Sequence, residues 1–150
     1  MERTIFDDIV EGKVKSWPVW ENDEFIAFLT RFPNTPGFTI VIPKKNPGDY
    51  VFGLTDELYV RFMEAIKEVA HILEKAFSTP RVALIFEGTG VAYVHAKLIP
   101  LHGDLAGQTD VWSPHKEFSE EYRGWFTSAE GPEMDEDRLT EIQAQIRSVQ

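Results

Sequence analysis

Residues 90–100 read GVAYVHAKLIP, and in this stretch Tyr93, His95 and Lys97 recur at every second position between small or aliphatic residues. Successive side chains of an extended chain point to opposite sides of the backbone, so these three are expected to share one face of a strand. Each two-residue step advances about 6.6 Å, which places an imidazole between a phenol and an ammonium. Such a row is suited to phosphate chemistry.

The segments before this stretch predict a long helix followed by two antiparallel strands. Residues 56–77 carry apolar side chains at the i, i+3, i+4 spacing of one helix face. Thr55 can cap this helix, and Pro80 prevents its continuation. Residues 81–86 (RVALIF) and 92–99 are rich in strand-forming residues and are joined through two glycines, which predicts a hairpin.

The first part of the chain predicts a further three strands. After a short helical or irregular start, residues 14–20 and 25–29 form the arms of a hairpin whose turn contains Asn22 and Asp23. Residues 38–42 (FTIVI) predict a short buried strand that ends at Pro43. The chain is therefore expected to be an α+β protein, with an antiparallel sheet of about five strands packed with one long helix.

The C-terminal part of the chain differs in composition. Residues 117–137 contain eight acidic residues and one arginine, which is typical of a solvated surface. Aromatic residues between 112 and 126 are expected to pack a loop onto the domain, and an apolar stripe predicts a last helix from about Met134. We therefore divide the chain into a domain at 1–115 and an acidic C-terminal extension at 116–150. Whether the last helix docks onto the domain or forms a dimer contact stays open.

Composition and charge exclude several classes of protein. The chain of 150 residues is 43% hydrophobic, contains no cysteine, and has no apolar run near the ~20 residues needed to span a bilayer. Its formal net charge of −10 opposes nonspecific binding to nucleic acid and to anionic membranes. We expect a cytoplasmic protein without nucleic-acid or membrane partners, in which a small anionic ligand needs a local basic site.

Three blocks of sequence together carry a family resemblance. Residues 28–46 (FLTRFPNTPGFTIVIPKKN), the long helix and residues 90–100 resemble, in kind and order, the histidine-triad (HIT) superfamily of nucleotide hydrolases and transferases. The resemblance spans about Ile5 to Pro100. It implies a HIT-like fold, with the C-terminal extension added to it, and a two-fold homodimer in which the sheets of the two copies are joined.

The resemblance also implies roles for the three residues of the first motif. The three histidines of the family are represented here by Tyr93, His95 and Lys97, and the central one is the nucleophile of the family, so His95 is the expected catalytic residue. Lys97 would stabilise charge on the transferred phosphoryl group, although a solvated lysine is an open alternative. Tyr93 would donate a hydrogen bond to a phosphate oxygen or to the leaving group, unless it serves packing alone.

Four further residues are candidate ligand contacts. In the family's pattern, Thr30 stands where an acid or amide contacts the ribose, and Glu87 stands where asparagine is common. Lys44 follows a strand end, where a phosphate clamp is one reading and a solvated turn is the other. His102 lies just after the last strand and is expected to reach the rim of the site.

The zinc site that many bacterial relatives carry is expected to be absent. Its four ligand positions hold Thr4, Asp7, Asn46 and Tyr93, which supply neither a thiolate nor an imidazole. We therefore expect neither a metal nor another cofactor.

The function implied by these residues is that of a HIT-like nucleotide hydrolase or nucleotidyltransferase. It would act at a phosphate ester or anhydride through His95, with activity reduced or altered by the changed neighbours. The alternatives are a noncatalytic module that binds a nucleotide or phosphate compound, and an interaction scaffold built on the acidic extension.

Overall fold

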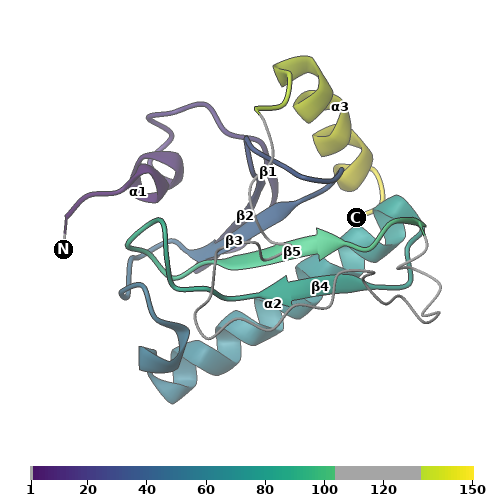
Figure 1. Ribbon diagram of the computed structural model, residues 1–150. Helices are drawn as coiled ribbons and strands as arrows, with labels where there is room; N and C mark the ends of the chain where they lie inside the picture. Colours follow the sequence, from purple (N-terminus) through teal and green to yellow (C-terminus); the bar gives the residue numbers. More distant parts are fainter. Residues whose placement is uncertain (1, 104–132) are drawn as a thin grey trace, which may run out of the picture.

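The computed structural model describes residues 2–103 and 133–150, and its elements follow the predicted α+β order (Figure 1). In chain order they are α1 (Ile5–Val10), β1 (Pro18–Glu21), β2 (Phe25–Leu29), β3 (Thr39–Pro43), a 3₁₀ helix (Val51–Gly53), α2 (Asp56–Phe77), β4 (Val82–Ile85), β5 (Ala96–Pro100) and α3 (Glu136–Arg147). Among the described helices, none has the length and apolar content needed to cross a bilayer.

The strands form one five-stranded sheet, which confirms the predicted fold class. Their spatial order is β1-β2-β3-β5-β4, and every neighbouring pair is antiparallel. The register places Phe28 opposite Ile40, and Ile40 opposite Lys97. These three side chains therefore lie in a row across the middle of the sheet, on the face that carries the site described below.

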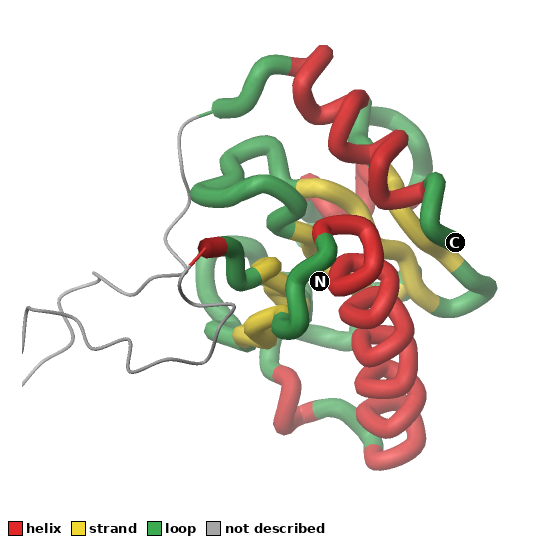
Figure 2. The backbone as a smooth tube through the Cα atoms, turned by 90° about the vertical axis from the view of Figure 1, so that its right-hand side faces the viewer, coloured by secondary structure: helices red, strands yellow, loops and turns green. Residues whose placement is uncertain are grey.

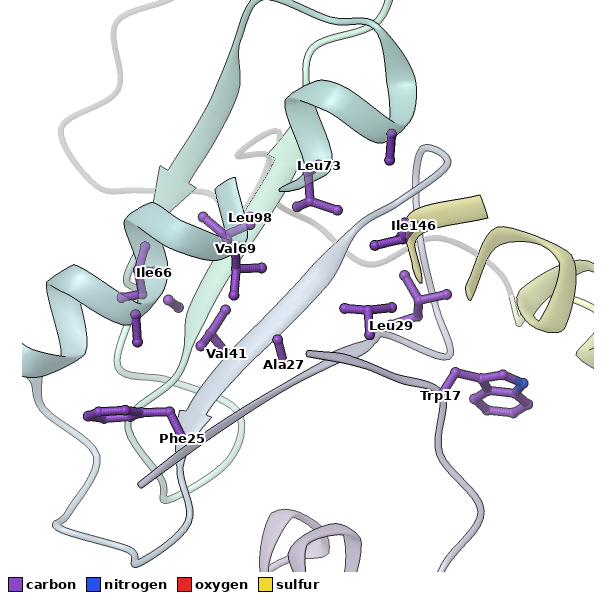
Figure 3. Packing of buried hydrophobic residues seen from close by; sticks show 14 of the residues in the cluster. Trp17, Phe25, Ala27, Leu29, Val41, Ile66, Val69, Leu73, Leu98 and Ile146 are labelled. Atoms are coloured by element: carbon purple, nitrogen blue, oxygen red, sulfur yellow. The ribbon is translucent and has the colours of Figure 1, made fainter. Parts of the chain in front are cut away.

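The two faces of the sheet pack against different helices. On one face, Val41 of β3 and Leu98 of β5 lie against Val69 and Leu73 of α2, and Figure 3 shows these side chains directed toward one another. On the other face, a second buried cluster joins strand residues to Phe6 of α1. Because strand side chains alternate between faces, the same strands supply both clusters.

Helix α3 is part of the main core. Three of its residues are almost fully buried in the cluster between the sheet and α2, namely Leu139, Ile142 and Ile146. Figure 2 shows α3 near one end of α2, and the Gln145 side-chain amide donates a hydrogen bond to the carbonyl oxygen of Ala76 at 2.8 Å there. Docking onto the domain is thus observed for this helix. The predicted boundary at residue 116 and the aromatic residues of 112–126 lie outside the described residues.

Two predicted strands begin several residues later than expected. The arm predicted at 14–20 begins only at Pro18, because residues 14–16 line a cavity instead of extending the ladder. The strand predicted at 92–99 begins at Ala96. Before it, the backbone N–H of Val94 donates to the carbonyl oxygen of Gly48 at 2.6 Å, so this segment bonds to a loop rather than to β4. Tyr93 and His95 therefore precede the strand on which they were predicted.

Candidate functional site

A cavity of about 720 Å³ lies between α1, the segment before β1, the end of β2 and the loop before β5. Its walls are mainly apolar, with Phe6, Ile9, Trp17, Phe28, Ile40 and Val91 among the lining residues. Four of the polar residues that the sequence singled out also line it, namely Thr30, Glu87, His95 and Lys97. The fold thus joins a large apolar pocket to a small set of convergent polar groups, as is usual for small-molecule sites.

The His95 ring is held in one orientation by its own backbone. Its Nδ1 lies 2.7 Å from the carbonyl oxygen of Tyr93, and because a carbonyl only accepts, Nδ1 must carry the proton. In the neutral ring, Nε2 is then the nitrogen with the lone pair. The edge-to-face ring of Phe6, with centroids 5.3 Å apart, packs against the imidazole. The carbonyl of Tyr93 therefore fixes both the orientation and the tautomer of this ring.

Lys97 meets a carboxylate in the same cavity. Its Nζ forms an ion pair with Oε2 of Glu87, and the two side chains are 10% and 27% exposed. An ammonium that is largely removed from water requires a counter-charge, and Glu87 supplies it. Lys97 is therefore not a solvated lysine, and its charge is balanced before any ligand arrives.

Thr30 follows the end of β2 and is buried at the wall of the cavity. Its Oγ1 accepts a hydrogen bond from the backbone N–H of Phe32 at 3.3 Å. A hydroxyl has one donor and two acceptor lone pairs, so this bond leaves Thr30 a donor and an acceptor for a ligand. A carboxylate at this position would accept only.

The Tyr93 hydroxyl is directed away from the cavity. It donates to the carbonyl oxygen of Pro43 at 2.6 Å, and the side chain is fully buried. Burial raises the pKa of the Tyr93 phenol well above its ordinary value, and the nearby charge of Asp7 raises it further. Tyr93 is not among the lining residues, and its contacts are those of a core side chain.

Two other predicted contacts also lie outside the cavity lining. The Lys44 ammonium is 2.9 Å from a carboxylate oxygen of Glu21. His102 donates from Nε2 to the carbonyl oxygen of Pro36 at 2.8 Å and packs edge-on against Phe77. The structure thus brings together the side chains of Thr30, Glu87, His95 and Lys97 in the cavity wall. The side chains of the other three predicted residues do not join them, and Tyr93 meets His95 only through its backbone carbonyl.

The sequence reasoning missed the contribution of α1 and of the segment before β1. Ile5, Phe6 and Ile9 line the cavity. Ile5 and Ile9 are spaced i, i+4 and Phe6 and Ile9 are spaced i, i+3 in residues 5–10 (IFDDIV), a pattern that indicates a buried helix face. Lys15 and Arg31 stack over the Trp17 ring, 5.4 and 5.2 Å from its centroid. No local pattern indicates this stack, because its members come from two separate segments.

Thr4, Asp7 and Asn46, three of the positions that the family resemblance assigned to a zinc site, make other contacts. The Thr4 backbone N–H and hydroxyl both donate to Asp7, at 2.7 and 2.8 Å, and cap α1. Asn46 donates to the carbonyl oxygen of Ala92 at 3.2 Å and accepts from the backbone of Gly48. Within residues 2–103 and 133–150, no three histidine, aspartate or glutamate side chains are grouped in a way that would hold a metal ion.

Comparisons with known proteins agree with this architecture. The family model of the HIT domain matches residues 11–104. A Bacillus subtilis relative, Protein hit, is 30% identical over 119 residues, covering 76% of this chain and 81% of that protein. An uncharacterised HIT-like protein of Saccharolobus solfataricus is 27% identical over 123 residues, covering 79% of this chain and 88% of that protein.

A solved structure extends the match to almost the whole chain. The crystal structure of a hypothetical histidine triad nucleotide-binding protein from Sulfolobus tokodaii superposes with a TM-score of 0.74 at 21% identity, over 97% of this chain and 90% of that one. At this identity the likeness concerns the fold alone. Since the family model covers well over half of the sequence, the chain belongs to the HIT domain family.

Proposed function

We propose that this protein is a nucleotide hydrolase or nucleotidyltransferase that acts at a phosphate ester or anhydride with His95 as its nucleophile. The observation that carries the proposal is the bond from His95 Nδ1 to the Tyr93 carbonyl, which leaves Nε2 as the nucleophilic nitrogen of a ring in the cavity wall. A neutral imidazole fixed in this way is an effective nucleophile toward phosphorus.

The proposed reaction has two displacements. His95 Nε2 forms a bond to the α-phosphorus while the bond from phosphorus to the leaving oxygen breaks, and the electron pair departs with that oxygen. Water or an acceptor hydroxyl then attacks the same phosphorus and releases its proton. The phosphorus–nitrogen bond breaks, and its electron pair returns to the imidazole. Lys97, in the same cavity wall, would donate hydrogen bonds to the phosphoryl oxygens as charge develops on them.

The rest of the cavity suits a nucleoside. Phe6 and Phe28 supply aromatic surface and Ile40 supplies aliphatic surface, against which a base can be buried. The Thr30 hydroxyl would bond to a sugar hydroxyl. The side chains of Tyr93, Lys44 and His102 have no part in this proposal, because their contacts lie elsewhere. Tyr93 contributes only its backbone carbonyl, which orients the His95 ring.

The proposal is tested by comparing two histidine variants across a panel of nucleoside phosphoesters, dinucleotide polyphosphates and nucleotidyl sugars. His95→Asn should lower turnover at least 10³-fold, because it removes the nucleophile of both steps. His71→Asn is the matched control, since the His71 side chain is 63% exposed and bonds only to Glu74 among the described residues. Equal turnover of wild type and His95→Asn would contradict the proposal, and so would an inactive wild type.

A second function is favoured by the ion pair of Lys97. Because Glu87 already balances the ammonium, the site offers less free positive charge for a transition state than an unpaired lysine would. The protein would then be a noncatalytic module that binds a nucleotide or phosphate compound. Micromolar binding of AMP or GMP in calorimetry, with no turnover of any panel member, would favour this function over the first.

We also propose a homodimer formed at the edge strand β4. The groove between α2 and β4 is mostly apolar, and Val60 and Leu84 at its wall are 54% and 40% exposed. Among the described strands, β4 has no neighbour on its outer side, and a strand edge of this kind with apolar side chains invites pairing with a second copy. Light scattering should give twice the chain mass of 17.2 kDa, and Leu84→Lys should lower it to one chain mass. A wild-type mass of one chain would refute the dimer.

A further inference from the structure

The cations that line the cavity are already balanced by carboxylates. Lys97 is paired with Glu87, as described above. Lys15 forms an ion pair with Glu136 at the start of α3, and Arg31 contacts the same carboxylate at 3.1 Å. Arg31 also lies 3.5 Å from a carboxylate oxygen of Glu133. Among the described residues, each of the three lining cations therefore has an acidic partner.

This balance restricts the charge of a ligand that the cavity can hold. A site for a polyphosphate normally gathers unbalanced positive charge around the phosphates. Here Glu87 is paired with Lys97, which lines the cavity together with His95, and the chain as a whole carries a formal charge of −10. A second or third negative charge on a ligand would face this carboxylate, and the described lining offers no further unpaired lysine or arginine to offset it.

The Lys97 ammonium can nevertheless serve one phosphoryl oxygen. It has three N–H donors, and the ion pair with Glu87 engages one of them. The remainder of the cavity wall is mainly apolar. Burying a charge against such a wall is costly, so the part of the ligand beyond the phosphoryl group should bind most tightly when it is uncharged. A ligand with one negative charge at the phosphorus and a large aromatic or apolar group therefore matches both the Lys97 ammonium and the apolar walls of the cavity.

We propose that the cavity selects phosphoryl compounds with a single negative charge at the reacting phosphorus, and that Glu87 is the residue that excludes more highly charged ones. The proposal rests on the proposed function for the identity of the site and adds its substrate class: singly charged esters of nucleoside monophosphates rather than polyphosphates. Each further charge on the ligand is expected to weaken binding by about tenfold, from the repulsion of two charges several ångströms apart in a partly dry site.

The test is a calorimetric series at pH 8 with three ligands that share one nucleoside: the methyl ester of the monophosphate, the monophosphate and the diphosphate. Wild type should bind the methyl ester most tightly and the diphosphate least. Glu87→Gln keeps the size of the side chain and should flatten or reverse this order. Lys97→Gln should steepen it, because the carboxylate then stands unbalanced.

Glu24→Gln is the matched control for Glu87→Gln. It changes the net charge of the chain by the same amount, but Glu24 is paired with Arg61 at 2.7 Å and does not line the cavity. It should keep the wild-type order of affinities. The proposal is overturned if wild type prefers the diphosphate, if Glu87→Gln keeps the wild-type ratios, or if wild type binds none of the three ligands.

Turnover of a p-nitrophenyl ester of the same nucleoside monophosphate separates this proposal from the proposed catalysis. No turnover, together with the expected order of affinities, would reject catalysis and support charge selection by Glu87. Turnover that depends on His95, together with unchanged selectivity in Glu87→Gln, would support catalysis and reject charge selection.

Discussion

Tyr93→Phe separates a structural tyrosine from a catalytic one, because the change removes the hydroxyl and keeps the ring. The hydroxyl donates to the carbonyl oxygen of Pro43 at 2.6 Å, and the side chain is fully buried. The ring, which packs edge-on against Phe6 with centroids 5.8 Å apart, is unchanged by the substitution. We therefore expect a loss of stability with little loss of turnover.

The magnitude follows from the buried hydrogen bond. Losing such a bond, with the acceptor left dry, costs about 1–3 kcal/mol of unfolding free energy at pH 7. Burial, and then the charge of Asp7, raises the pKa of the Tyr93 phenol in the folded state. The stability contributed by the neutral phenol is fully present below its ordinary pKa of about 10 and is lost as the pH rises above it. The difference between wild type and Tyr93→Phe should therefore shrink in alkaline solution.

The assay is urea unfolding at pH 7 and at pH 10.5, with kcat/KM measured at pH 7. Tyr50→Phe is the control, because the Tyr50 side chain is 60% exposed. Removing its hydroxyl should lower the free energy of unfolding by less than about 0.5 kcal/mol. A fall in kcat/KM of a hundredfold or more in Tyr93→Phe, at unchanged stability, would refute the reasoning and make Tyr93 a catalytic donor.

Three further predictions concern α3, a close backbone approach and metal content. Ile142→Ala should cost about 2–5 kcal/mol in guanidinium unfolding, because Ile142 is 2% exposed in the main core, and a cost below 1 kcal/mol would show that α3 is dispensable. Gly37→Ala should lower the melting temperature clearly more than Gly12→Ala. Both glycines have a positive φ, but only at Gly37 would a Cβ lie 2.3 Å from the Phe77 ring. Equal melting temperatures of the two variants would count against this packing. Elemental analysis of purified protein should find less than about 0.1 zinc per chain, whereas about one would contradict the expected loss of the metal site.

The parts of the fold that the sequence predicted best are those where several local signals agree. Helix α2 was predicted at its observed bounds, because an apolar stripe, the Thr55 cap and Pro80 all indicate the same element. Strand β2 was likewise predicted at its observed bounds, Phe25–Leu29. The early start predicted for β5 was wrong, because the N–H of Val94 bonds to Gly48, a residue far away in sequence.

The sequence singled out His95, which lines the cavity, but it did not predict the surroundings of that residue. His95 could be singled out because its spacing and the family resemblance converge on one position. The pairing of Lys97 with Glu87 could not be predicted, because the turn between them decides whether their side chains meet. Glycine-rich turns have many conformations, so the sequence does not fix this turn. The same holds for Lys15 and Arg31, whose shared carboxylate Glu136 lies at the other end of the chain.

The central claim is a covalent intermediate on His95, and it is tested most directly by trapping that intermediate. Protein mixed with a nucleoside p-nitrophenyl phosphate is quenched within one turnover in alkaline denaturant, because phosphorus–nitrogen bonds to histidine break in acid, and is then digested for mass spectrometry. We predict one nucleotidyl group on the peptide that contains His95 and none in His95→Asn. Turnover without this adduct, or an adduct on another residue, would contradict the account.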